Sequence, residues 1–124
     1  MVSSAQVILV PFSSSKWGWI AYDIDGEVIG KSKMLPSRSL AEQNLEALAR
    51  LSVGLLGHPT TTYPFVFYRR DAKWHWKLDR HCRISLHSYG EWTSYYEAEN
   101  NLRRLSLLIQ FRDPTLGRFS ETKG

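Results

Sequence analysis

Basic side chains gather in the second half of the chain, where their types and spacing would suit contacts with phosphates. Over fifteen consecutive positions the chain carries Arg69, Arg70, Lys73, His75, Lys77, Arg80 and Arg83. Lysine and arginine neutralise the phosphates of nucleic acids, and nearby rings can stack on unpaired bases. Aromatic residues follow directly, as Tyr89, Trp92, Tyr95 and Tyr96. We therefore predict a surface that binds nucleic acid, either RNA or single-stranded DNA.

Two other interpretations of these residues stay open. The face of a sheet that no helix covers is normally polar, so the basic residues could simply be solvated. Alternatively, an exposed sheet edge or a cluster of Trp92, Tyr95 and Tyr96 could dock a partner protein. Both nucleic-acid binding and protein docking describe a binding module without catalytic activity.

Metal-ligating residue types also occur, but their spacing does not match a known kind of site. His75, His81, Cys82 and His87 include neither Cys-x-x-Cys nor His-Glu-x-x-His. Alternation along an extended chain would also spread them over both faces. The stretch Asp23-x-Asp25-Gly26-Glu27 lacks the distal glutamate of a calcium loop and is better explained as a turn. We expect no metal and no cofactor.

Catalytic motifs are missing from the sequence. It contains no glycine-rich phosphate loop and no nucleophile elbow. Cys82 and His81 are neighbours, but adjacent residues of an extended chain point in opposite directions and would not form a nucleophile and base. We predict that the protein is not an enzyme; an enzyme would need a deep pocket with a perturbed titrating group.

Composition indicates one small soluble domain. The chain has 124 residues, a net charge of +4 and a single cysteine, so no intrachain disulfide can form. Residues 1–57 carry five basic and five acidic side chains, whereas residues 58–124 carry eleven and seven, together with all four histidines. The aliphatic run Val7–Val10 is too short for a signal peptide or a membrane span. We therefore expect a cytoplasmic protein.

The first half predicts three strands and a helix. Strands are expected over Val7–Phe12, Lys16–Ile24 and Glu27–Gly30, with a type I′ turn at Asp25-Gly26. A capping box at Ser39–Glu42 predicts the start of a helix that ends near Gly54 or Gly57. Its apolar stripe comprises Ala41, Leu45, Leu48 and Ser52.

The second half repeats this order. Strands are expected over Phe65–Arg69, Lys73–Arg80 and Ile84–Tyr89, with a less regular loop at Cys82-Arg83. Ser94-x-x-Glu97 predicts a second helix start, followed by a buried stripe of Ala98, Leu102, Leu105 and Ile109. A further strand could follow each helix, over Thr60–Tyr63 and over Ile109–Arg112 or Gly117–Ser120.

The two halves align without a gap at an offset of 57 residues. Ten positions are then identical, namely Lys16, Trp17, Trp19, Ser37, Ala41, Glu42, Asn44, Leu45, Leu48 and Leu51 with their partners, against about three expected by chance. We infer one domain of two tandem repeats, at about 5–57 and 62–114, and a flexible tail at 115–124. Because Trp17/Trp19 and Trp74/Trp76 occur in both repeats, we expect these pairs to lie in the core. The alternative is an exposed stacking platform.

These motifs resemble the YegP-like family of small uncharacterised proteins. The resemblance rests on Trp17-Gly18-Trp19, on Asp25-Gly26-Glu27-Val28-Ile29-Gly30-x-Ser32, and on Trp74-His75-Trp76-Lys77-Leu78 with its following helix. It implies an α+β fold of two β-β-β-α-β repeats in one antiparallel sheet, with the last strands exchanged and both helices on one face. It also implies a monomer with internal pseudo-twofold symmetry, and it implies no activity.

Overall fold

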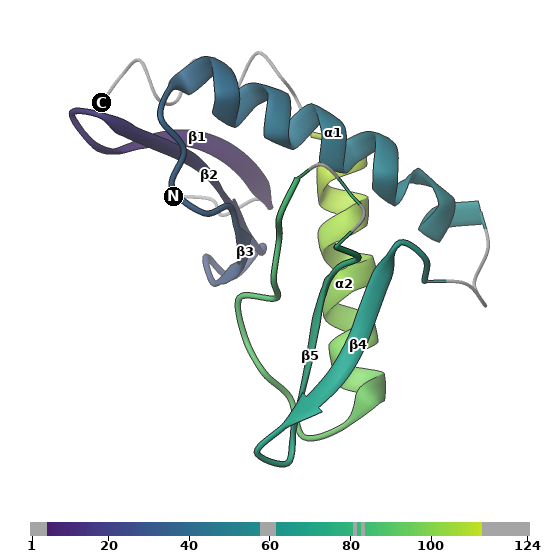
Figure 1. The fold of residues 1–124 in the computed structure, drawn as a ribbon. Coiled ribbons are helices and arrows are strands. Elements are labelled where there is room, and N and C mark those ends of the chain that lie inside the picture. Colours follow the sequence, from purple (N-terminus) through teal and green to yellow (C-terminus); the bar gives the residue numbers. More distant parts are fainter. Residues whose placement is uncertain (1–4, 58–61, 81, 83, 113–124) are drawn as a thin grey trace.

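The structure, a computed structural model, describes residues 5–57, 62–80, 82 and 84–112. Its described part is an α+β fold of two helices and two small antiparallel sheets (Figure 1). The elements, in chain order, are β1 (Gln6–Ser13), β2 (Lys16–Tyr22), β3 (Val28–Lys31), α1 (Arg38–Gly57), β4 (Phe65–Arg70), β5 (Lys73–Leu78) and α2 (Tyr95–Gln110). Neither helix combines the length and apolar character that crossing a membrane requires. The predicted tail at 115–124 lies outside the described residues.

The prediction of one continuous sheet is wrong, because β1, β2 and β3 form one sheet and β4 and β5 form another. The segment expected as a third strand of the second half, Ile84–Tyr89, runs beside β5 without a regular ladder. Its contacts with β5 are the isolated bridge Lys77–His87 and the backbone bonds Leu78 N to Leu86 O (2.9 Å) and Ser88 N to Trp76 O (2.7 Å).

The strands expected after each helix are not formed in the described residues. Tyr63 lies in a turn, and Ile109 is the last buried residue of the α2 stripe, one helical turn after Leu105. A residue committed to the helical core cannot also begin a strand, so the prediction for Ile109–Arg112 is wrong. Residues 60, 61 and 117–120 lie outside the described residues.

The turns of the two hairpins differ from the predicted ones. Between β2 and β3, Gly26 N donates to Asp23 O (2.9 Å) and Asp23 N to Glu27 O (2.7 Å), which closes a three-residue loop. Only Gly26 has a positive φ, so the predicted type I′ turn, which needs two such residues, is wrong. The I′ pattern occurs instead between β4 and β5, at Asp71 (φ 56°) and Ala72 (φ 66°).

Serine caps both helices. Glu97 N donates to Ser94 Oγ (3.1 Å), as the sequence predicts for α2. In α1 the corresponding bond runs from Leu40 N to Ser37 Oγ (3.1 Å), and the helix begins at Arg38. The predicted capping box two residues later is therefore wrong, whereas the predicted helix end at Gly57 is confirmed.

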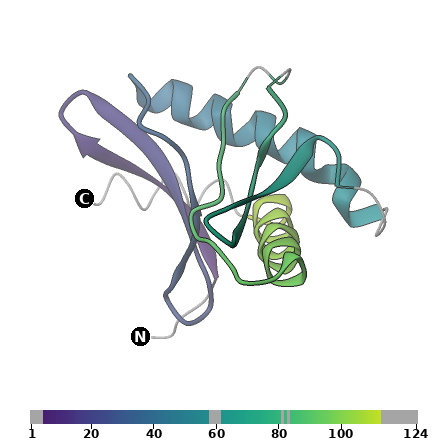
Figure 2. The same ribbon diagram turned by 60° about the horizontal axis from the view of Figure 1, so that its bottom comes forward.

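The core lies between the helices and the inner faces of the sheets. In both views α1 packs on β1 and β2 and crosses α2, which packs on β5 (Figures 1 and 2). Both predicted helical stripes are buried. Trp19 and Trp76 are fully buried, each with its indole N–H bonded to a helix asparagine, at 2.8 Å for Asn44 and 2.9 Å for Asn101.

The first tryptophan of each pair is only half-buried. Trp17 packs against the core, and Trp74 packs edge-on against the ring of Tyr95. The core interpretation of the tryptophan pairs is thus supported, and an exposed platform built from all four rings is excluded.

Several contacts recur 57 residues apart. They are the indole-to-amide bonds Trp19–Asn44 and Trp76–Asn101, the paired backbone bonds Trp17–Leu35 and Trp74–Trp92, and the helix caps Ser37–Leu40 and Ser94–Glu97. The offset is not uniform, however. In β1 the residue opposite Trp19 is Leu9, and in β4 the residue opposite Trp76 is Phe67. Leu9 and Phe67 are 58 positions apart, one more than the general offset, because the register of β1 shifts between Pro11 and Ser13.

Candidate nucleic-acid interface

The β4–β5 hairpin separates its side chains onto two faces. Its inner face carries Phe65, Phe67, Arg69, Trp74, Trp76 and Leu78, and its outer face carries Val66, Tyr68, Arg70, Lys73, His75 and Lys77. Strand alternation explains this division, since residues two apart share a face and directly opposed residues lie side by side. The outer pairs are Val66–Lys77, Tyr68–His75 and Arg70–Lys73. Four of the seven predicted basic residues therefore share one surface, which we call the outer β4–β5 face.

Tyr68 lies at the centre of this face. Its ring stacks on that of His75, with centroids 5.2 Å apart and planes inclined by 15°. The Lys77 Nζ lies 5.2 Å from the Tyr68 centroid and the Arg70 guanidinium carbon 5.6 Å from it, distances typical of cation–π contacts. The face thus presents a stacked ring pair beside two cations.

One carboxylate borders this surface. Glu91 Oε1 lies 3.7 Å from His75 Nε2, and the Glu91 side chain is more than half exposed. At that distance and exposure the attraction is weak, and it stabilises little. Glu91 and the turn residue Asp71 partly offset the positive charge of the outer β4–β5 face.

The other predicted basic residues lie elsewhere. Arg69 belongs to the inner face, where its guanidinium carbon lies 5.8 Å from the Trp74 ring. Arg80 is exposed beyond the end of β5, and Arg83 lies outside the described residues. Sequence reasoning missed Tyr68, although its position two residues before Arg70 and opposite His75 across the Asp71-Ala72 turn would have placed it on this face.

The three aromatic residues proposed for protein docking do not form one cluster. Tyr95 packs on Phe67 (centroids 4.8 Å) and Trp74 (5.4 Å), and desolvation by burial, followed by the Glu99 charge, raises the pKa of its hydroxyl. Trp92 is joined to Trp74 by two backbone bonds and packs against the core. Tyr96 is 75% exposed and lines, together with Trp92, a groove that Tyr95 does not line.

The candidate metal ligands are engaged singly or lie apart. The His75 ring stacks on that of Tyr68, and His87 forms an isolated backbone β-bridge with Lys77. His81 is outside the described residues. Cys82 is half-buried, and desolvation raises the pKa of its thiol. Across the described ranges no three His, Cys, Asp or Glu side chains are placed to hold a metal ion together.

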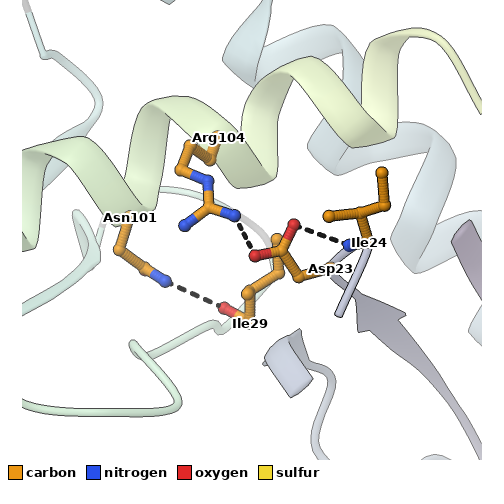
Figure 3. A network of polar contacts seen from close by, with 5 residues as sticks. All are labelled: Asp23, Ile24, Ile29, Asn101 and Arg104. Atoms are coloured by element: carbon orange, nitrogen blue, oxygen red, sulfur yellow. Dashed lines mark hydrogen bonds and ion pairs between the residues drawn. The ribbon is translucent and has the colours of Figure 1, made fainter. Parts of the chain in front are cut away.

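The aspartate of the calcium-like stretch has a structural role (Figure 3). The Asp23 carboxylate accepts hydrogen bonds from Ile24 N (2.7 Å) and from the Arg104 guanidinium of α2. The bond from Arg104 is the largest cause of a lowered Asp23 pKa. Nearby, Asn101 Nδ2 donates to Ile29 O (3.2 Å), so α2 is tied to the β2–β3 hairpin at two points.

Comparison of the sequence with protein-family models and with curated proteins finds no match. Two solved structures have a similar fold. One is the solution NMR structure of YegP from E. coli, a protein of unknown function, with a TM-score of 0.69 and 12% identity over 90% of this chain and 91% of that one. The other is the UPF0339 protein SO3888 from Shewanella oneidensis, with a TM-score of 0.67 and 15% identity over 86% of each chain. The likeness shows that the chain shares an α+β fold with these YegP and UPF0339 proteins.

Proposed function

We propose that the protein is a non-enzymatic module that binds RNA or single-stranded DNA through the outer β4–β5 face. The observation that carries this proposal is the stacked Tyr68–His75 pair with Arg70 and Lys77 beside the Tyr68 ring. Proteins that bind single strands without strong sequence preference combine cations that contact phosphates with rings on which bases stack. This face supplies both kinds of group within one hairpin.

Each side chain would have a distinct part in binding. Arg70, Lys73 and Lys77 would contact phosphates, and Tyr68 with His75 would stack on an unpaired base. Lys77 is exposed, and its partner across the strands, Val66, adds exposed apolar surface for a base or ribose. Phosphate contacts carry no sequence information and stacking on rings accepts every base, so we expect low sequence specificity.

We further propose that the chain comprises two tandem repeats, at about 5–57 and 62–114, with pseudo-twofold symmetry within a cytoplasmic monomer. The recurrent tryptophan–asparagine bonds, strand–loop bonds and serine caps support common ancestry of the two halves. The ten identities at the 57-residue offset support it independently. On this proposal the second repeat gained its basic face after duplication.

The test is binding of fluorescent single-stranded oligonucleotides at low and moderate salt. The double variant Arg70→Glu/Lys77→Glu should weaken binding at least tenfold. It should also flatten the salt dependence by about 1.4 in log–log slope, at roughly 0.7 per lost phosphate contact. The control Lys33→Glu/Arg50→Glu makes the same charge change at exposed positions of the first half and should have a smaller effect. No detectable binding at low salt, or equal losses in both variants, would overturn the proposal.

Docking of a protein partner is the alternative outcome of this experiment. In that case reversing Arg69, Arg70, Arg80 and Arg83 would leave nucleic-acid affinity unchanged. Removal of the aromatic side chains at Trp92, Tyr95 and Tyr96 would instead abolish capture of a partner. Tyr95 packs on Phe67 and Trp74 and does not join Trp92 and Tyr96 in their groove, so a single aromatic docking cluster is the less favoured interpretation.

A further inference from the structure

A groove that does not involve the outer β4–β5 face lies between the β2–β3 hairpin and α2. Three segments line it: Glu27–Ile29, the stretch from Tyr89 to Trp92, and the α2 side chains from Tyr96 to Arg104. Its volume is about 440 Å³, within the range of 300–1,000 Å³ common for small-molecule sites. The Asn101–Ile29 bond and the Arg104–Asp23 ion pair hold its two sides together (Figure 3).

Three aromatic rings and two carboxylates are among the eleven lining residues. Tyr89, Trp92 and Tyr96 contribute rings, and Tyr89 and Tyr96 are 54% and 75% exposed. Glu27 and Glu97 contribute carboxylates. Gly90 lies beside the Trp92 ring: a Cβ at Gly90 would be 3.4 Å from it, an ordinary van der Waals distance.

The described lining carries two carboxylates against one cation, and Lys31 Nζ lies 5.9 Å from the centroid of the Tyr89 ring. Arg104 is the one cation among the described lining residues, and the Asp23 carboxylate pairs with it. Hydrogen bonds from Thr93 (3.0 Å) and Ser94 (3.3 Å) to Glu97 Oε1 lower the pKa of Glu97, which is therefore ionised at neutral pH. Glu27 is exposed in the adjoining loop.

We propose that this groove binds a small organic cation with a primary alkylammonium group. The negative face of an aromatic ring attracts ammonium groups, and the carboxylates can accept their N–H hydrogen bonds. The rings also offer apolar surface to an attached alkyl chain. The two glutamates would repel an anion. A neutral alcohol would have neither ionic attraction to the carboxylates nor a cation–π interaction with the rings.

Titration with 1,5-diaminopentane, followed by ¹H–¹⁵N NMR of the full chain, tests the proposal. The Trp92 indole and Asn101 side-chain signals should shift on binding, while pentanol and pentanoate should leave them in place. Tetramethylammonium carries the charge but cannot donate a hydrogen bond, so it should bind more weakly than the diamine.

Variants distinguish this site from general attraction to acidic surface. Glu27→Gln and Tyr96→Leu alter exposed side chains and should each weaken binding about threefold, and together about tenfold, as expected for exposed ion-pair and cation–π contacts. Asp25→Asn removes the same charge two residues away, outside the groove lining, and should leave affinity nearly unchanged. Equal effects of Asp25→Asn and Glu27→Gln, or no signal shift at 10-fold excess over millimolar protein, would overturn the proposal.

Discussion

Each half begins with a hairpin, β1–β2 in the first and β4–β5 in the second. Their inner faces are similar, but the outer face is apolar in β1–β2 and basic in β4–β5. Inside, each presents a fully buried tryptophan whose indole N–H is bonded to a helix asparagine. Outside, β1–β2 carries the half-buried apolar residues Ile8, Val10, Phe12, Ile20 and Tyr22, whereas β4–β5 carries the Tyr68-centred basic set. The inner face must satisfy the same packing in both halves. The outer face is free to differ, and a function confined to one half is therefore most readily sought there.

One pair of corresponding positions illustrates this difference. Gly18 lies beneath the Phe12 ring, since a Cβ built at Gly18 would come within 2.4 Å of that ring and 2.6 Å of Ser32 Oγ. In the second half the corresponding residue is His75, which stacks on Tyr68. A packed glycine in one half is thus matched in the other by an imidazole that is 18% exposed and stacks on Tyr68.

The largest effect should come from breaking what the halves share. Trp19→Phe and Trp76→Phe each leave a helix asparagine without its donor and remove buried volume, so we expect each to cost about 2–4 kcal/mol of unfolding free energy. Urea unfolding measures both values. The comparison predicts similar losses; a loss below about 1 kcal/mol for only one of them would show that the two cores are not equivalent.

The next largest effect compares how much the outer faces of the two hairpins contribute to stability. Gly18→Ala places a methyl group against Phe12 and against Ser32, whose hydroxyl accepts from Trp19 N at 3.0 Å, and should destabilise the fold by about 1–3 kcal/mol. His75→Ala at the corresponding position removes a partly exposed ring and should cost less than about 1 kcal/mol. Thermal or urea unfolding of both variants tests the difference. Equal losses would mean that the outer β4–β5 face contributes to folding as strongly as the Phe12–Gly18 contact.

Sequence patterns predicted the helices and strands better than the turns and helix starts that bound them. The spacing of Ala98, Leu102 and Leu105 predicts a buried helical stripe because a helix repeats every 3.6 residues, and all three are buried. The capping serine of α2 was also predictable, since Ser94 precedes Glu97 at the spacing of a capping box. In α1, Ser37 and Ser39 both precede a helix-forming stretch, and local spacing favours the wrong one.

Tertiary effects explain what the sequence could not predict. A gapless alignment at an offset of 57 does not reveal the irregularity in β1. Because of it, the residue that corresponds to Phe67 is Leu9, one position earlier than that alignment predicts. The separation of Arg69 from Arg70 follows from alternation only once the strand register is known. Glu27 and Tyr96 line the same groove although they are 69 positions apart in the sequence, so no local pattern predicts this groove.

A third prediction compares the turns between the first two strands of each half. Ala72 adopts a φ of 66°, a conformation that costs a residue with a Cβ about 1 kcal/mol relative to glycine. Ala72→Gly should therefore stabilise the protein by about 0.5–1 kcal/mol. Ser15→Gly, at the corresponding position in the first half, should not stabilise it, since Ser15 is not among the residues with positive φ. Equal stabilisation by both changes in urea unfolding would contradict the difference in turn geometry.

The smallest expected effect concerns the Asp23–Arg104 ion pair, which joins the β2–β3 loop to α2. The second half has Arg80 at the position corresponding to Asp23 and so cannot form the same pair. The Arg104 hydrogen bond lowers the Asp23 pKa in the folded state. The unfolded chain then binds the proton more readily, so the pair stabilises the fold above the ordinary aspartate pKa of about 3.9 and loses its contribution as the pH falls through the lower, folded value.

Because Arg104 is nearly half exposed, solvent screens the pair, and Asp23→Asn should cost only about 0.5 kcal/mol at pH 7. The gap between the variant and the natural protein should close as the pH is lowered below about 4. Urea unfolding at pH 7 and at pH 3, with Asp25→Asn as the exposed control in the same loop, measures this change. A gap that stays constant over this range would mean that Asp23 acts through packing or through a geometry that asparagine does not reproduce, and not through its charge.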